Sequence, residues 1–253
     1  MYAEERHQLI VEQARSAGRV DVGALAEQFE VTAETVRRDL TALERQGLLR
    51  RVHGGAIPVE RLGFEPALAA RDAAATAEKQ RIAKAALAEL PADGAILLDA
   101  GSTTARLAEL LPVDRELTVV TNALPIAATL AARPNLTVHL LGGRVRGRTM
   151  ATVDAWGARL LADTYVDVAF MGTNGISRER GLTTPDVAEA EIKRAMIAAA
   201  RRTVVLADHT KVGVDHFARF GAIDDVDVLV TDSGIDPGIA LDLDSAGVRV
   251  VQA

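Results

Sequence analysis

The sequence predicts a two-part α/β protein, with a small helical N-terminal unit and a larger unit built on a doubly wound, mostly parallel sheet. Three amphipathic segments and a short basic hairpin fill the first 57 residues. From residue 77 onward, apolar runs of strand length alternate with helical segments, which is typical of a parallel sheet covered on both faces. With 253 residues, 49% of them apolar and 25% charged, the chain cannot be disordered. We expect domains at 1–57 and 77–253, joined by a linker at 58–76.

The N-terminal unit is expected to contain three helices and a strand pair. Helices are predicted at 3–17 and 22–29, separated by a break at Gly18. A turn at 30–32 then leads into a third helix, for which Thr32 is a suitable N-cap. Gly47 favours the end of that helix, and the segment 48–52 followed by two glycines predicts a tight hairpin.

The third helix has two distinct faces. Val36, Leu40 and Leu43 fall at spacings of four and three, so they form one apolar stripe, and polar residues occupy the opposite sector. Two helices, a short turn and a basic hairpin in this order are typical of a winged helix-turn-helix, in which the last helix enters the major groove. The candidate DNA-binding residues are Thr32, Glu34, Thr35, Arg37, Arg38 and Thr41 on the helix and Arg50, Arg51 and His53 in the wing.

A three-helix bundle with a solvated arginine face is the alternative to a DNA reader. The net charge of −6 also argues against strong phosphate binding by the whole chain. The charge is unevenly distributed, however, because residues 35–53 hold five arginines and only two acidic residues, a local net charge of +3. We therefore expect a DNA reader with modest non-specific affinity.

The larger unit is expected to alternate helices and strands. Helices are predicted at 77–90, after Ser102, and at 125–131, 154–162 and 187–201. Strands are predicted at 95–98, 117–120, 136–141, 166–171, 203–206, 226–230 and 248–251. Before them, residues 58–75 suit a linker, although its alanine-rich end could begin a helix.

Small and polar residues follow the predicted strands, at the sheet edge where such folds bind ligands. The candidate effector-binding residues are Asp99, Gly101, Ser102, Thr103, Thr104, Thr121, Asn122, Gly142, Gly143, Arg144, Asn174, Gly175, Glu189 and Lys211. A glycine turn with three hydroxyls at a helix N-terminus can bind an anion, and a lysine can add a point charge. Each motif alone is explained by a cap, a turn or a solvated lysine, but together they predict a pocket for a small phosphorylated polyol.

Several neighbouring residues leave alternatives open. Arg146 and Arg148 could assist the pocket, although a solvated basic loop is the simpler interpretation. Glu189 could hold sugar hydroxyls or pair with Lys193, which lies one helical turn further on. A metal site formed by Asp208, His209, Asp215 and His216 is a minor alternative, because their spacing matches no familiar ligand motif; we expect no metal and no cofactor.

The motifs resemble those of the DeoR family of bacterial transcription regulators along nearly the whole chain. They are VTAETVRRDLTALERQGLLRRVHGGA, LLDAGSTT, VVTNALPIA, LLGGRVR, VAFMGTNGI, EAEIKRAM and LADHTK. The resemblance implies a winged helix-turn-helix joined to an effector domain similar to ribose-5-phosphate isomerase, and release from operator DNA by a phosphorylated sugar. Among family members, the chain looks similar to actinobacterial regulators of fructose-uptake operons, which implies fructose 1-phosphate or fructose 1,6-bisphosphate.

An enzyme is the main rival class, because related sheets carry sugar-phosphate isomerases and deaminases with carboxylate bases. Here the segment after a central strand reads Gly172-Thr173-Asn174-Gly175 and has no titratable side chain, so we expect a regulator without catalysis. The absence of cysteine excludes disulfides and thiol catalysis, and no apolar run is long enough for a membrane span. The absence of cysteine is most simply explained by a cytoplasmic location. Because helix-turn-helix proteins usually pair to bind two half-sites, we also expect a homodimer or homotetramer.

Overall fold

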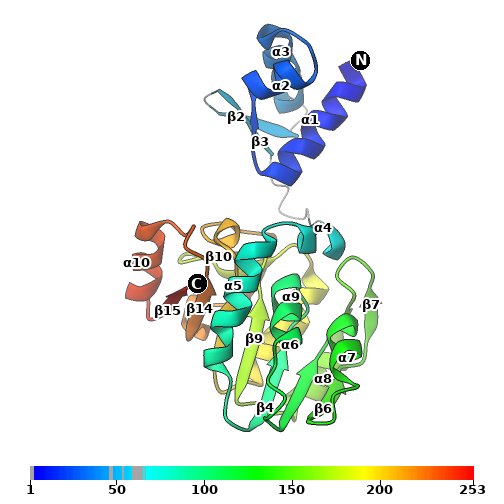
Figure 1. Cartoon of the computed structure of the whole chain (residues 1–253), viewed down its shortest axis with the longest axis vertical. Helices are drawn as coiled ribbons and strands as arrows, with labels where there is room; N and C mark the ends of the chain where they lie inside the picture. Colours follow the sequence, from blue (N-terminus) through cyan, green and yellow to red (C-terminus); the bar gives the residue numbers. More distant parts are fainter. Residues whose placement is uncertain (1–2, 46–47, 53, 59–64, 66) are drawn as a thin grey trace. The chain divides into compact units, whose positions relative to one another are not determined.

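The computed structural model describes residues 3–45, 48–52, 54–58, 65 and 67–253, which form two units, 1–61 and 62–253 (Figure 1). The boundary between the units lies inside the stretch expected to be a linker. Helix α4 (Leu68–Ala73) also forms within that stretch and contacts α6 of the second unit. We call the first unit, which is expected to contact DNA, the reader, and the second, which is expected to bind an effector, the sensor.

The reader consists of three helices and a small antiparallel sheet. The helices are α1 (Ala3–Ala17), α2 (Val22–Gln28) and α3 (Ala33–Arg45). The strands are β1 (Val20–Asp21), β2 (Leu49–Val52) and β3 (Gly55–Pro58), with β3 in the middle of the sheet. Ile10, Leu25, Leu40 and Leu49 are fully buried and join all three helices and the hairpin in one core.

The sheet of the sensor has seven strands, all parallel, in the order β15-β14-β12-β9-β4-β5-β6. Their bounds are β4 (Gly94–Leu98), β5 (Leu117–Thr121), β6 (Leu136–Leu140), β9 (Val168–Gly172), β12 (Thr203–Leu206), β14 (Val228–Thr231) and β15 (Arg249–Gln252). The expected fold class, a helix-turn-helix unit followed by a mixed α/β unit with a parallel sheet, is confirmed.

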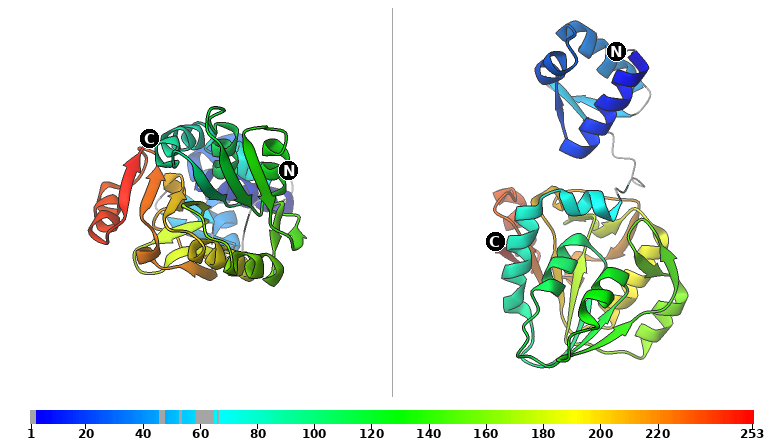
Figure 2. Two further views of the ribbon diagram at one scale, coloured as in Figure 1. Left: turned by 90° about the horizontal axis from the view of Figure 1, so that it is seen from below. Right: turned by 45° about the vertical axis from the view of Figure 1, so that its right-hand side comes forward.

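Helices cover both faces of this sheet (Figure 2, left). One layer contains α5 (Thr76–Ala86), α6 (Ser102–Glu109) and α7 (Leu124–Leu130), and the other contains α8 (Ala155–Ala162), α9 (Val187–Ala198) and α10 (Pro237–Ser245). Successive residues of a strand enter opposite cores: Leu97 packs with the α9 layer, whereas Ile96 and Leu98 pack with the α5 layer. Burial on both faces explains why these strands are continuous apolar runs.

Some short elements were not expected from the sequence. They are β7 (Arg144–Arg146), β8 (Ala151–Val153), β10 (Gly175–Ser177), β11 (Gly181–Thr184), β13 (Ala218–Gly221), the helix α10 and the 3-10 turns at His209–Lys211 and Ile223–Asp225. The helix expected at 77–90 is observed as α5 continued by a 3-10 turn at Leu87–Glu89. Strands β7 and β8 form an antiparallel pair, and β10, β11 and β13 form a three-stranded sheet. These strands of three or four residues are too short to show a clear alternation.

Candidate DNA interface and effector site

Helix α3 presents its polar residues to solvent because its apolar stripe is anchored in the reader core. Val36, Leu40 and Leu43 are buried as the spacing predicted. The Thr32 hydroxyl oxygen accepts a hydrogen bond from the Thr35 backbone N–H at 3.1 Å, so Thr32 caps the helix. Its contribution to a DNA site would therefore be to fix the start of the helix.

The exposed face of α3 carries two arginines. Arg37 is half exposed and donates to Glu34 at 3.2 Å, a weak surface ion pair that phosphate or a base edge could replace. Arg38 is exposed beside it. On the wing, the Arg51 guanidinium donates to the Thr41 hydroxyl at 3.1 Å, which links the hairpin to α3. His53 and the side chain of Arg50 lie outside the described part of the chain.

Two glycines shape the wing. Gly54 has a φ of +77°, which an L side chain rarely adopts. A Cβ on Gly55 would lie 2.0 Å from the Val20 carbonyl oxygen, so only glycine allows β1 and β3 to pair this closely. The two glycines therefore fix how the hairpin joins the rest of the reader.

A buried ion pair joins α1 to α3, and the sequence did not predict it. Arg6 makes two hydrogen bonds to the Asp39 carboxylate, at 2.6 and 3.1 Å, and His7 adds a third contact at 3.0 Å. Burial raises the pKa of Asp39, but the hydrogen bonds from Arg6 and His7 outweigh it, so the pKa is lowered. The available signal was position, since Asp39 falls three residues after Val36 and thus on the buried stripe.

In the sensor, the carboxyl ends of the central strands meet at one edge of the sheet. Leu98 of β4 pairs with Thr121 of β5 and with Phe170 of β9, and Leu206 of β12 pairs with Gly172 of β9. The polar residues that follow these strands are therefore brought together, as the sequence indicated.

Asp99 and Lys193 hold this edge together. The Lys193 ammonium donates to the Asp99 carboxylate and to the Gly172 carbonyl oxygen, and the Gly172 N–H donates to Asp99 at 3.0 Å. Asp99 is fully buried, so it connects β4 and β9 from within. Lys193 is thus the ion-pair partner of Asp99. Of the two alternatives for Glu189, pairing with Lys193 is limited to an electrostatic influence that lowers the pKa of Glu189.

Thr121 and Asn122 also serve the fold. The Thr121 hydroxyl donates to the Leu98 carbonyl oxygen at 2.7 Å. The Asn122 amide accepts from the Ala100 N–H and donates to the Thr152 carbonyl oxygen. Both side chains fix the loops around the site.

Helix α6 begins with Ser102 immediately after Gly101, which provides no side-chain cap. The first N–H groups of a helix have no partner within the helix, and they favour an anion. The Thr104 hydroxyl donates back to the Gly101 carbonyl oxygen at 3.0 Å and so shapes the turn. The remaining hydroxyls of this turn belong to Ser102 and Thr103.

Lys79 of α5 is a buried lysine within electrostatic range of Lys211. Burial lowers the pKa of Lys79, and the charges of Lys211 and Arg106 lower it further, whereas those of Asp208 and Asp72 raise it. Lys79 donates to the backbone carbonyls of Arg71 and Ala74, which are neutral acceptors. Lys79 was not predicted as a site residue, because a lysine within an amphipathic helix is usually solvated.

A second group of polar residues surrounds Arg146, which is largely buried. Its guanidinium contacts three carboxylates: Glu65 at 2.5 Å, Asp186 at 3.1 Å and Glu189 at 3.2 Å. Arg148 donates to the Glu65 backbone carbonyl. The interpretation of this loop as solvated is therefore wrong for Arg146, because burial together with three acidic partners makes it the centre of a network.

Glu189 lies inside the same network. Its carboxylate accepts hydrogen bonds from Thr149 and Arg146 on one oxygen and from Thr184 at 3.4 Å on the other. Burial, followed by the negative charge of Glu65, raises the pKa of Glu189. Asn174 belongs to this group as well, since it donates to Glu65 and accepts from Thr184.

The other predicted residues stand further from this network. Arg144 is mostly exposed and pairs with Asp154 at 3.0 Å. Gly143 has a φ of +148°, and a Cβ there would lie 2.4 Å from the Val153 carbonyl oxygen. A Cβ on Gly175 would lie 2.2 Å from the Val214 carbonyl oxygen, whereas Gly142 has open space around it. Gly143 and Gly175 thus allow close approach of two backbone segments.

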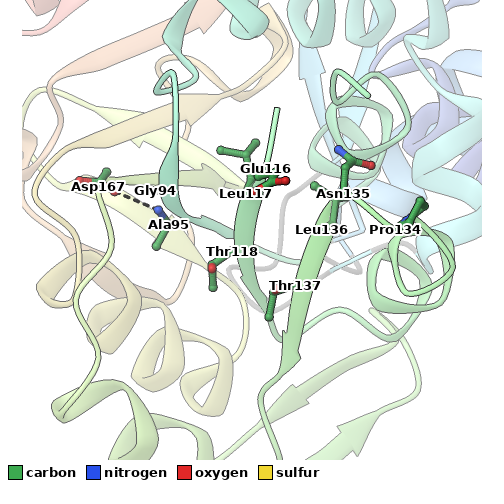
Figure 3. A pocket seen from close by; sticks show the side chains of 10 residues that line it. All are labelled: Gly94, Ala95, Glu116, Leu117, Thr118, Pro134, Asn135, Leu136, Thr137 and Asp167. Atoms are coloured by element: carbon green, nitrogen blue, oxygen red, sulfur yellow. Dashed lines mark hydrogen bonds between the residues drawn. The ribbon is translucent and has the colours of Figure 1, made fainter. Parts of the chain in front are cut away.

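A surface hollow lies at the opposite edge of the sheet (Figure 3). It is lined by Gly94, Ala95, Glu116, Leu117, Thr118, Pro134, Asn135, Leu136, Thr137 and Asp167. These residues lie at the amino ends of the strands, and Asp167 is held by the Ala95 N–H at 2.9 Å. Ligands of parallel sheets bind at the carboxyl ends of the strands, so this hollow is not the candidate effector site.

The described residues contain no cluster of three or more histidine or acidic side chains placed to hold a metal ion. His209 contacts Asp232 at 2.8 Å and Asp215 accepts from Ser177, so these two side chains face different partners. Within the same residues, no helix combines the length and apolarity needed to cross a bilayer.

A helix-turn-helix unit followed by a parallel-sheet unit is the architecture of a class of two-domain transcription regulators. Residues 6–61 match the model of the DeoR-like helix-turn-helix domain, and residues 74–233 match that of the DeoR C terminal sensor domain. The chain belongs to the DeoR family of transcriptional regulators.

Relatives match along almost the full length. The chain is 36% identical to the HTH-type transcriptional regulator GlpR of Haloferax volcanii, over 99% of this chain and 98% of that protein. It is 37% identical to the HTH-type transcriptional regulator FruR of Bacillus subtilis and 31% identical to the Glycerol-3-phosphate regulon repressor of Escherichia coli, with 92% of each chain covered.

Solved structures are more distant. Ribose 5-phosphate isomerase A from Methanocaldococcus jannaschii is similar over 53% of each chain, with 18% identity and a TM-score of 0.38. A likeness of this size says nothing about activity.

Proposed function

We propose that this protein is a transcriptional repressor of a sugar operon and that a phosphorylated sugar releases it from operator DNA. The observation that carries the proposal is the combination of two features in one sensor. The N-terminus of α6 has no side-chain cap and opens with hydroxyl side chains, and the Arg146 network supplies groups that can bind sugar hydroxyls. The family and the names of its regulator relatives support DNA as the partner of the reader.

In this proposal Thr103, Ser102 and the first N–H groups of α6 bind the phosphate, and Lys211 adds charge. Asn174 and Glu189 hold sugar hydroxyls. Asp99, Thr121 and Asn122 act indirectly, because their side chains are already used to position the loops. The preferred effectors are fructose 1-phosphate and fructose 1,6-bisphosphate, on the strength of the motif resemblance to fructose-operon regulators.

We also propose that the sensor binds its effector without converting it. The raised pKa of Glu189 is the observation in favour of an enzyme, since a general base often shows such a shift. However, both of its oxygens accept hydrogen bonds from side chains of the fold, so Glu189 is better suited to positioning. Turnover of a sugar phosphate that disappears in Glu189→Gln would favour the enzyme instead.

A thermal-shift screen of sugar phosphates against the full chain tests effector binding. A ligand that binds only the native state must raise the melting temperature of the sensor. We expect at least one phosphorylated sugar to do so, and its unphosphorylated parent to have no effect at the same concentration. A screen in which no sugar phosphate stabilises the protein would contradict the proposal.

A further inference from the structure

A carboxylate from the stretch between the two units already occupies the Arg146 network. Glu65 lies only a few residues after the end of the reader, and its side chain is 1% exposed. It accepts hydrogen bonds from Arg146 and from Asn174, the latter at 3.3 Å, and it pairs with Arg71 at 3.2 Å. Asn174 is one of the residues expected to contact the effector.

The cations around Glu65 provide more donors than the protein uses. Within the described residues, Arg71 Nε and Nη2 are buried and have no hydrogen-bond partner. A carboxylate has two oxygens, whereas a phosphate has three that can accept hydrogen bonds and carries more negative charge. A second phosphate of the effector beside Arg146 and Arg71, as fructose 1,6-bisphosphate provides, could therefore satisfy donors that Glu65 leaves free.

The acids around Arg146 repel one another. Glu65, Asp186 and Glu189 share a single guanidinium, and the Glu65 charge contributes to the raised pKa of Glu189. Of the three, Asp186 and Glu189 belong to the start of α9, where Asp186 caps the helix. Glu65 is the acid that can leave without disturbing a helix of the sensor.

We propose that the Glu65 carboxylate occupies the position that an anionic group of the effector takes when it binds, and that effector binding displaces Glu65 from Arg146 and Arg71. This inference rests on the function proposed above and adds how the sensor communicates with the reader. The effector must compete with Glu65 for Arg146 and Arg71. Its apparent affinity for the protein is therefore its intrinsic affinity multiplied by the fraction of molecules in which Glu65 has left the network.

Displacement of Glu65 also gives the effector a route to the reader. The chain leads from Glu65 directly back to the reader and forward to α4, whose Asp72 accepts a hydrogen bond from Arg106 of α6 at 2.8 Å. Displacement would release residue 65, which precedes α4 in the sequence, from the Arg146 network. An effector that binds only the displaced state shifts the equilibrium between the state with Glu65 seated in the network and the displaced state.

Calorimetric titration of the full-length protein with fructose 1,6-bisphosphate tests the competition. Glu65→Gln keeps the shape of the side chain and removes its charge, so we expect the sugar phosphate to bind about tenfold more tightly, within the usual range of coupling between sites. Glu179→Gln, at an exposed position, makes the same change of charge and should match the wild type.

Asp186→Asn is the second control, because it removes another negative charge from Arg146 while asparagine can still cap α9. If the effect is purely electrostatic, Glu65→Gln and Asp186→Asn should increase the affinity for the sugar phosphate equally. Displacement predicts a clearly larger gain in Glu65→Gln, and equal gains would overturn it.

Hydrogen exchange on the wild-type protein provides a test without any substitution. Saturating sugar phosphate should increase exchange in peptides that include Glu65 and α4 while protecting the start of α6. If the effector binds but these peptides are unchanged or protected, Glu65 stays seated and the inference is wrong. If no sugar phosphate binds the wild type, the proposed function itself has failed.

Discussion

Replacing Asp39 by asparagine should destabilise the reader without touching any candidate DNA-contacting residue. Asp39 and Arg6 are both buried, with side-chain exposures of 7% and 8%, and they make two hydrogen bonds to each other. Asparagine removes the negative charge and leaves the Arg6 guanidinium buried without its counterion. The asparagine amide also has only one acceptor oxygen, so it cannot accept all the hydrogen bonds that the Asp39 carboxylate accepts from Arg6 and His7.

The expected loss in the free energy of unfolding of the reader follows from the burial of this ion pair. Breaking a buried ion pair by removing one partner typically costs about 3–5 kcal/mol. A small domain has a total stability near the low end of roughly 5–15 kcal/mol. Since each 1.4 kcal/mol is about tenfold in an equilibrium constant, the ratio of folded to unfolded reader should fall by roughly 10²–10³ or more.

Scanning calorimetry of the full-length protein, together with operator binding by fluorescence anisotropy, measures the effect. The reader transition should move to lower temperature in Asp39→Asn and operator affinity should fall, while the sensor transition stays in place. Glu12→Gln, an exposed change on α1, is the matched control. The double variant Arg6→Met/Asp39→Leu should recover most of the stability, because apolar replacement of both partners removes the uncompensated charge.

The same pair predicts the response of the reader to acid. Because the pKa of Asp39 is lowered in the folded state, its contribution is fully present above the unfolded pKa of about 4 and is lost as the pH falls through the folded pKa. The wild-type reader should therefore lose stability below about pH 4, and Asp39→Asn should lose less over that range. Wild-type melting and operator binding in Asp39→Asn would refute this account of the ion pair.

The remaining predictions concern the two binding surfaces and self-association. Arg37→Ala or Arg38→Ala should cost about 1–3 kcal/mol at the cognate operator and weaken sequence preference, whereas Arg51→Ala should weaken all duplexes alike; unchanged operator binding by a folded Arg37→Ala/Arg38→Ala protein in anisotropy assays would contradict this. Thr103→Asp and Lys211→Ala should bind operator normally but need far more sugar phosphate for release, while Thr137→Asp, exposed at the opposite sheet edge, should behave as wild type; a wild-type response of Thr103→Asp would show that the phosphate binds elsewhere. Trp156 and Leu160 are exposed one turn apart on α8, so Trp156→Ala/Leu160→Lys should lower the oligomer mass in light scattering; an unchanged mass would place the subunit interface on another surface.

The sequence was sufficient for elements whose side-chain pattern has one explanation. The stripe of Val36, Leu40 and Leu43 and the apolar runs of the central strands follow directly from burial on one face of a helix or both faces of a sheet. The gathering of the polar residues after these strands at one sheet edge follows as well, because parallel strands end together.

Long-range pairing could not be read from the sequence. Arg146 looks like a surface residue until the fold places Glu65, Asp186 and Glu189 around it, and these partners lie 40 to 81 residues away along the chain. For Lys193 the sequence offered only Glu189, one helical turn away, as a possible partner, yet its ion-pair partner is Asp99, 94 residues away. A charged residue in a buried position can be recognised by its spacing, but its partner is decided by the tertiary structure.

Release of operator DNA by sugar phosphate tests the central claim most directly. An operator duplex selected from a random pool is labelled, and its anisotropy with the wild-type protein is followed during titration with fructose 1-phosphate, fructose 1,6-bisphosphate and fructose. We predict that at least one phosphorylated sugar lowers the anisotropy to that of free DNA and that fructose does not. If the complex survives every phosphorylated sugar, or if fructose releases it equally well, the phosphate-gated regulator described here is contradicted.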